Sequence, residues 1–137
     1  FRPRYEPIEG SDPIQFMTPY IPFTDRHFTP LQEEILQKDK HIVFAAGVDI
    51  NGFLPTHNKV YSQPQRPGEP AWNMGNCRNR RIFDDRAGLM AARNTKPKLL
   101  QTYFRDMGSE VVFMKECDIP IVVNGEQWGN LRIGYRA

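Results

Sequence analysis

The sequence predicts a single α+β domain, built on an antiparallel sheet with helices on one of its faces. Three observations lead to this prediction. The chain has 137 residues, which is enough for one hydrophobic core but not for two. A helix-type pattern near the start is followed by two strand-type runs, and three more strand-type runs close the chain after an irregular middle. Strands grouped in this way favour an antiparallel sheet over alternating βαβ units.

Residues 1–24 form the first unit, an arm that holds five of the twelve prolines. Proline fixes φ and removes a backbone donor, so the arm is predicted to be extended and irregular. Its many apolar side chains favour packing against the domain of residues 25–137 or against a second copy of the chain. The sizeable apolar residues are Phe1, Tyr5, Ile8, Ile14, Phe16, Met17, Tyr20, Ile21 and Phe23.

A helix is expected from Pro30 to Asp39. Thr29 and Gln32 form a capping-box pattern, and proline suits the first turn of a helix. Residues 31, 35 and 36 place apolar side chains on one face, and charged residues fill the other face. The helix is expected to end near Asp39.

Two strands are predicted after this helix. Ile42–Asp49 is a short apolar run, typical of a buried strand. Asn51 and Gly52 favour a tight turn, because both residues tolerate positive φ. Residues 53–57 return as the second strand, and Pro55 indicates that this strand lies at the sheet edge, since proline cannot donate to a ladder.

The rest of the chain is predicted to be a loop, a helical middle and three strands. Residues 58–76 have loop composition, and the segment from 78 to 98 is expected to supply one or two short helices. Asn124 and Gly125 are a strong hairpin signal between the last two strands. The strand-type runs are 99–104, 110–118 with 120–123, and 127–135.

A basic stretch from Arg78 to Asp106 dominates the middle of the chain. It has eight cationic residues against three acids, whereas the whole chain has a net charge of only +2. The guanidinium group suits forked hydrogen bonding to carboxylates. Two interpretations stay open together: these arginines form internal ion pairs with residues such as Asp84 and Asp85, or some of them face a cavity and hold an anion. Because the segment must cross a sheet face, it is the predicted lid of a pocket.

Several function classes lose support at this point. The three histidines, at positions 27, 41 and 57, are not spaced as metal ligands, and no Gly-rich phosphate loop or nucleophile elbow is present. We therefore expect no catalytic residues, no metal site and no enzyme activity. The small net charge does not indicate nucleic-acid binding. No apolar run approaches the ~20 residues that span a bilayer. The chain begins at Phe1 rather than Met, and we expect it to be a piece of a longer protein that carries any membrane helix elsewhere.

Several blocks of the chain, in the same order, resemble sensor domains of bacterial methyl-accepting chemotaxis receptors, in the PAS/Cache-like branch. The likeness covers roughly residues 25 to 135. It rests on Asp49-x-Asn-Gly-Phe-Leu-Pro-Thr-His-Asn58, Arg80-Arg-Ile-Phe-Asp-Asp-Arg-Ala-Gly88, Ala92-Arg-Asn-Thr95, Leu99-Leu-Gln-Thr-Tyr-x-Arg-Asp106 and Pro120-Ile-x-Val-x-Gly-x-x-Trp-Gly-x-Leu-Arg-Ile-Gly-Tyr135.

This resemblance implies a five-stranded antiparallel sheet of order 2-1-5-4-3, with helices on one side that cover a ligand cavity. It also implies a sensory, ligand-binding role in a bacterial inner-membrane receptor. Some relatives carry covalent haem through Cys-x-x-Cys-His, but the stretch from Cys77 to Arg81 lacks the second Cys and the His. Covalent haem is therefore not expected.

The expected ligand is a small polar or anionic molecule held under the 78–98 segment. Tyr103 and Arg105 alternate on one strand and therefore share a face. His57 and Trp128 each have a structural alternative, as a hydrogen-bonded histidine and as a core aromatic. The candidate ligand-binding residues are His57, Arg81, Arg86, Tyr103, Arg105 and Trp128.

Two other functions remain open from the sequence. One is a redox or gas sensor with non-covalent haem, in which His57 or another histidine is the axial ligand. The other is a dimerisation module without a ligand. Closed two-fold dimers are the commonest oligomers, and we predict a homodimer to which the arm and the Pro30–Asp39 helix contribute.

Overall fold

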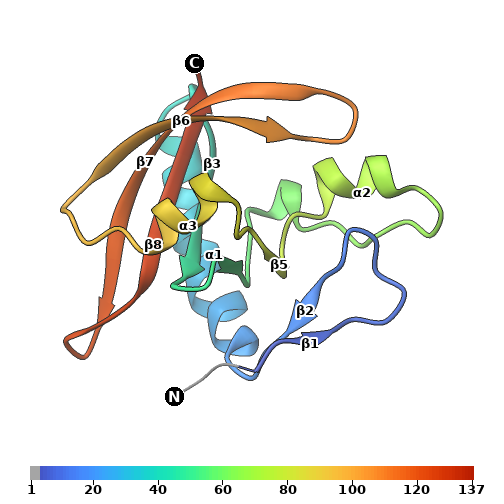
Figure 1. Cartoon of the computed structure of the whole chain (residues 1–137), viewed down its shortest axis with the longest axis horizontal. Coiled ribbons are helices and arrows are strands. Elements are labelled where there is room, and N and C mark those ends of the chain that lie inside the picture. Colours follow the sequence, from blue (N-terminus) through green and yellow to red (C-terminus); the bar gives the residue numbers. More distant parts are fainter. Residues whose placement is uncertain (1–3) are drawn as a thin grey trace.

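The computed structural model describes residues 4–137 and confirms the α+β class (Figure 1). Its main sheet is antiparallel and has the strand order β3-β8-β7-β6. Three helices and one 3-10 turn accompany it. The main strands are β3 (Ile42–Asp49), β6 (Leu99–Asp106), β7 (Val111–Val123) and β8 (Glu126–Arg136), and the helical elements are α1 (Ile21–Lys38), η1 (Lys59–Tyr61), α2 (Pro70–Asn76) and α3 (Arg86–Ala92).

The predicted fifth strand does not join the main sheet, which has four strands. The short β4 (Phe53–Leu54) pairs instead with β5 (Arg81–Ile82). Side-chain amides occupy the free edge of β3 in its place. The backbone N–H of Ala45 donates to Asn58 Oδ1, and that of Gly47 donates to Gln32 Oε1, both over 2.8 Å. The expected order is thus kept for four of the five strands.

Helix α1 begins nine residues before the predicted start, at Ile21, so the last residues of the predicted arm are helical. Pro22 occupies the first turn, where the missing N–H has no intrahelical role. Pro30 lies inside the helix and is exposed. Gln32 is not a cap but is buried, and its Nε2 donates to Thr56 O over 3.0 Å. The predicted end is confirmed, because Asp39 is the C-cap.

The arm lies along the domain. Its short ribbon pairs β1 (Glu6–Pro7) with β2 (Phe16–Met17). Gln65 Nε2 donates to Pro13 O over 2.8 Å, and Gln15 Nε2 donates to Asn79 O over 3.0 Å. Tyr5 donates through its hydroxyl group to Asp49 Oδ2. Phe1 lies outside the described residues, and the part that the arm plays in dimerisation stays a prediction.

The sequence had suggested that all helices lie on one face of the sheet. The structure places them on both faces. The core cluster of Ala46, Val48, Leu54 and Ala92 places α3 against one face, and Phe83 packs on this cluster. A Cβ at Gly47 would come within 3.0 Å of the Phe28 ring, so α1 reaches the opposite face beside β3. In Figure 1, α3 lies in front of the sheet and α1 behind β3.

The remaining elements follow the prediction except for η1, α2 and β5, which the sequence did not indicate. The hairpin turn at Asn124 and Gly125 is present, with φ of 52° and 79°. Helix α3 confirms a short helix in the basic segment, and α2 falls within residues 58–76, where only loop was expected. Cys77 and Cys117 are both free thiols. Among residues 4–137, no helix combines the length and the apolar character needed to cross a membrane.

Candidate anion-binding site

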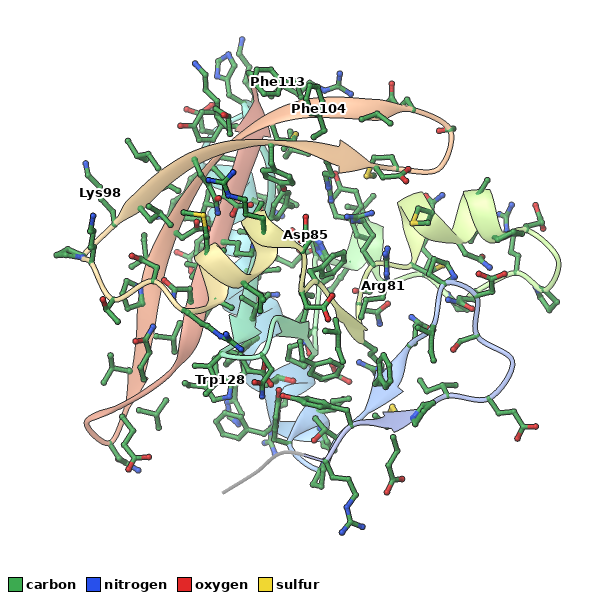
Figure 2. All side chains as sticks on the ribbon, viewed as in Figure 1. Arg81, Asp85, Lys98, Phe104, Phe113 and Trp128 are labelled. Atoms are coloured by element: carbon green, nitrogen blue, oxygen red, sulfur yellow. The ribbon has the colours of Figure 1, made fainter. Side chains whose placement is uncertain are left out.

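A cavity of about 310 Å³ lies between the main sheet and the segment that joins α2 to α3. Strands β3, β6 and β8 provide its floor, through Phe44, residues 103–106 and Arg132. The opposite wall consists of residues 81–85 together with Met74 and Arg78. In Figure 2, Arg81 and Asp85 lie on this cover, below the strands that carry Phe104 and Phe113. Of the predicted lid, Arg78 and residues 81–85 line this cavity, and residues 86–98 do not.

Arg105 is the arginine that is best placed to donate a hydrogen bond to a ligand in the cavity. It points inward from β6 and is only 4% exposed. Its guanidinium carbon lies 4.6 Å from the ring centres of Phe44 and of Tyr61. Its Nη2 is buried without a hydrogen-bond partner, and no carboxylate among the described residues forms an ion pair with it. Leaving such a donor unsatisfied costs about 1–3 kcal/mol, which an acceptor in the cavity would offset.

Arg81 occupies a matching position on the cover. Its Nη1 is also buried without a partner, and its guanidinium carbon lies 4.7 Å from the centre of the Phe83 ring. Burial lowers the pKa of Arg81, and the nearby Asp106 raises it in part. One unsatisfied guanidinium therefore lies on the floor of the cavity and another on its cover.

Arg78 is buried as well, but its hydrogen bonds are satisfied. Its Nη1 donates to Met74 O and to Asp106 O, each over 2.8 Å, and so ties α2 to the end of β6. Burial, followed by the charges of Arg105 and Arg81, lowers the pKa of Arg78. These mutual repulsions mean that an anion in the cavity would stabilise several cations at once.

Arg132 has a structural partner. Its Nε donates to Glu116 Oε2 over 2.9 Å, and the two side chains are 6% and 0% exposed. Burial alone would lower the pKa of Arg132, but Glu116 raises it above its ordinary value. Asp118 lies on the same face of β7 and accepts from Gln101 Nε2 over 2.8 Å. Burial and then Glu116 raise the pKa of Asp118 to about 9, so one of these two carboxyl groups is protonated at neutral pH.

His57 is a neutral donor at the side of the cavity. Its Nδ1 accepts the backbone N–H of Asn58 over 2.7 Å, which leaves Nε2 as the protonated nitrogen. Its ring packs edge-on against Phe44 and Tyr61. Burial, followed by the charge of Arg105, lowers the pKa of His57 well below its usual range. The structural interpretation of His57 and its place in the pocket therefore both hold.

The acidic residues of the site stay at its mouth. Asp84, Asp85 and Asp106 border the cavity and are all exposed. Asp85 Oδ1 accepts from Gly88 N as the cap of α3, and Asp106 Oδ1 accepts from Gly108 N in the turn after β6. Their charges are screened by water, whereas the guanidinium groups below them are buried. The interior of the cavity is thus rich in donors and positive.

Four of the six predicted ligand-binding residues line this cavity: His57, Arg81, Tyr103 and Arg105. Arg86 does not, because it is the exposed first residue of α3. Trp128 does not either. The register between β7 and β8 shifts next to it, and this bulge turns its side chain towards Tyr20 and Phe28. There it lines an apolar hollow of about 560 Å³, away from Arg81 in Figure 2.

Sequence reasoning missed several residues of the cavity, namely Phe44, Met74, Arg78, Phe83 and Arg132. Arg132 had a usable signal, because it alternates with Asn130 and Gly134 along a predicted strand. Met74 had none, since it reaches the cavity from α2, in a segment with loop composition. Arg78 had a partial signal, because it is the first residue of the basic stretch.

No family model, curated protein or solved structure matches this chain.

Proposed function

We propose that this chain is a ligand-binding sensory domain that holds a small organic anion between β6 and the cover segment of residues 78–98. The observation that carries the proposal is the pair of buried guanidinium nitrogens, Arg81 Nη1 and Arg105 Nη2, which lack partners and face one cavity. Buried donors are almost always hydrogen-bonded, so a pair of unsatisfied ones in a hollow indicates a missing acceptor. The resemblance to chemotaxis receptors supports a sensory role in a bacterial inner-membrane receptor.

The chemistry of the walls favours a carboxylate. Each guanidinium lies against an aromatic ring, which holds its plane and its forked donors in a fixed direction. Planar carboxylates match this fork, and Tyr103 and His57 Nε2 add further donors. Phe44, Leu54 and Met74 give the cavity an apolar side for a short carbon skeleton. The volume of about 310 Å³ suits a compact molecule.

Signalling would arise from the position of the two arginines on different elements. Arg105 belongs to the sheet and Arg81 to the cover, so an anion bound to both would draw the cover towards β6. A ligand shifts such an equilibrium only by as much as it binds the two arrangements unequally. An anion that reaches Arg105 but not Arg81 should bind without this movement.

The test is a thermal-shift and calorimetric screen of the 137-residue chain with small carboxylates. Inorganic sulfate and the neutral amides of the same compounds are the reference solutes. Binding to the native state alone raises stability by about 2.7 kcal/mol when the ligand is at roughly 100 times its Kd. We expect the acids, but not the amides, to raise the melting temperature of the chain. The absence of any shift across the acids would refute the proposal.

Arg81→Gln and Arg86→Gln form a matched pair for the same screen. The two arginines lie five residues apart in one segment, but only Arg81 reaches the cavity. Arg81→Gln should weaken binding of the best acid by about tenfold or more, since a charge-assisted hydrogen bond contributes roughly 1.5–3 kcal/mol. Arg86→Gln should leave it unchanged. Equal effects of both substitutions would mean that the segment acts through its general charge.

Non-covalent haem at His57 does not fit the observed hydrogen bond. An axial histidine offers an unprotonated Nε2 and keeps its proton on Nδ1. Here Nδ1 accepts from Asn58 N, so the proton is on Nε2. His27 and His41 are exposed and do not line the cavity. A visible-light spectrum of the purified chain with a Soret band would contradict this conclusion.

A further inference from the structure

An apolar area on the main sheet faces away from the cavity. The strand register places Phe104 opposite Phe113, with ring centres 5.1 Å apart. Asp106 pairs with Val111, and Leu100 with Cys117, so the neighbouring apolar side chains continue along both strands on this face. We call the group the outer patch: Leu100, Phe104, Val111, Phe113 and Ile119, which are 63%, 73%, 64%, 48% and 39% exposed.

Nothing else in the described chain covers this patch. Helix α1 lies on the same side of the sheet, but its Phe28 packs near Gly47 of β3 and on Trp128 of β8, and the patch residues stay exposed. Figure 2 shows Phe104 and Phe113 together on the strands, on the side away from Arg81. With ~150–200 Å² for each fully exposed side chain, the patch leaves roughly 500 Å² of apolar surface in water. A standard protein interface buries about 800 Å² per partner, so the patch suffices for the centre of one.

The charges at the two ends of the patch indicate which partner fits. Lys96 and Lys98 come directly before β6, and Asp106 and Glu110 lie at the hairpin end of the same strand pair. All four side chains are exposed, and Glu110 also forms an exposed ion pair with Arg136 over 3.5 Å. A second copy related by a two-fold axis that lies in the plane of the contact, perpendicular to the strands, would face the first copy and run antiparallel to it. Its lysine end would then lie over the acidic end of the first copy, at both ends of the contact.

We propose that the outer patch is the surface through which two copies of this chain associate, face to face and antiparallel, around Phe104 and Phe113. A two-fold contact uses the same surface on both copies. This patch is complementary to itself, because its apolar centre would meet an apolar centre and its basic end would meet an acidic end. Lys115 is the one cation within the area. Lysine can keep its long stem on apolar surface while its ammonium group stays in water, so an exposed Lys115 is compatible with the contact. The inference does not depend on the ligand of the cavity.

The contact has a direct relation to the cavity, because one strand serves both. In β6 the side chains of Tyr103 and Arg105 point to the cavity, and those of Leu100 and Phe104 point to the patch. This location differs from the arm and the helix that the sequence suggested for dimerisation. A substitution in the patch and one on α1 therefore separate the two possibilities.

The experiment measures the mass of the 137-residue chain by sedimentation equilibrium from low- to high-micromolar concentration. We expect twice the 15.9 kDa of a single chain at the upper end. Phe104→Glu should weaken association by about tenfold or more, as loss of a central aromatic residue does in other interfaces. The control is Leu31→Glu on α1, where the side chain is 60% exposed, and it should associate like the parent.

Far-UV circular dichroism confirms that each variant is folded, and Phe104→Ser replaces Phe104→Glu if the latter is not. A monomeric parent, unchanged association of the Phe104 variant, or a loss with Leu31→Glu would each overturn the proposal. A charge exchange tests the orientation. Lys98→Glu should weaken association, and adding Glu110→Lys to it should restore association. A double variant weaker than Lys98→Glu alone would exclude the antiparallel arrangement.

Discussion

Substitution by methionine, which keeps an apolar stem and removes the charge, should cost much more stability at Arg132 than at Arg105. Arg132→Met leaves Glu116 buried without the cation that now lies 2.9 Å away, and a buried pair broken in this way costs about 3–5 kcal/mol. Arg105→Met removes a guanidinium that has no carboxylate partner. It loses two aromatic contacts of about 0.5–2 kcal/mol each, and it relieves an unsatisfied donor of about 1–3 kcal/mol. The expected net change for Arg105→Met is within about 1 kcal/mol.

The assay is urea unfolding of the ligand-free chain near neutral pH, in a buffer without carboxylates. Equal m values establish that the free energies of unfolding can be compared. Arg132→Met should be less stable than Arg105→Met by about 2 kcal/mol or more. If Arg105→Met loses as much stability as Arg132→Met, Arg105 is a structural residue and the assignment of the cavity to an anion fails.

Three further predictions follow from the buried groups and from α1. The pKa of Asp118, about 9 against an ordinary value of 3.8, means that the folded chain binds this proton more tightly than the unfolded chain. The stability of the parent relative to Asp118→Asn should therefore fall as pH rises between these values, by up to about 1.4 kcal/mol per pH unit, which urea unfolding at several pH values can check. The pKa of His57 is lowered in the folded chain, so the contribution of neutral His57 to stability is lost as pH falls below the ordinary value of 6.5. An NMR titration midpoint of the ring near 6.5 would contradict this. Pro30→Ala should raise stability by about 1–2 kcal/mol in thermal unfolding. A proline inside a helix costs about 3 kcal/mol, and part of this cost is offset because proline also restricts the unfolded chain. An unchanged or lower Tm would contradict the prediction.

Local patterns predicted the elements that local physics determines. The apolar run of β3, the hairpin at Asn124 and Gly125, and the alternation of Tyr103 with Arg105 all needed only near neighbours in sequence. The end of α1 near Asp39 was equally accessible. Its start was not, because Pro30 breaks a local rule and is tolerated inside a helix whose Gln32 is held by bonds to other elements.

Local patterns also indicated part of the candidate site, since four of its six predicted residues line the cavity. An Arg-rich segment over a sheet indicated a covered pocket, but it did not distinguish Arg81 from Arg86, since the direction of each depends on where α3 begins. Trp128 was misplaced by a bulge that depends on the register between two strands. Arg132 has a buried partner, Glu116, at a position sixteen residues away, and only the folded sheet brings the two together.

The edge of β3 is bonded by side-chain amides, one of them from α1, rather than by a fifth backbone strand. A fifth backbone strand would have locked that edge by a cooperative ladder. Here Gln32 and Asn58 make the bonds to Gly47 and Ala45 one at a time, each with a net contribution of about 1 kcal/mol. A displacement of α1 along β3 therefore breaks side-chain bonds and leaves the four-stranded sheet whole. A difference of about 2 kcal/mol changes a two-state population by roughly thirtyfold, so these two bonds can bias the position of α1, which buried Ile21, Thr24 and Gln32 also hold.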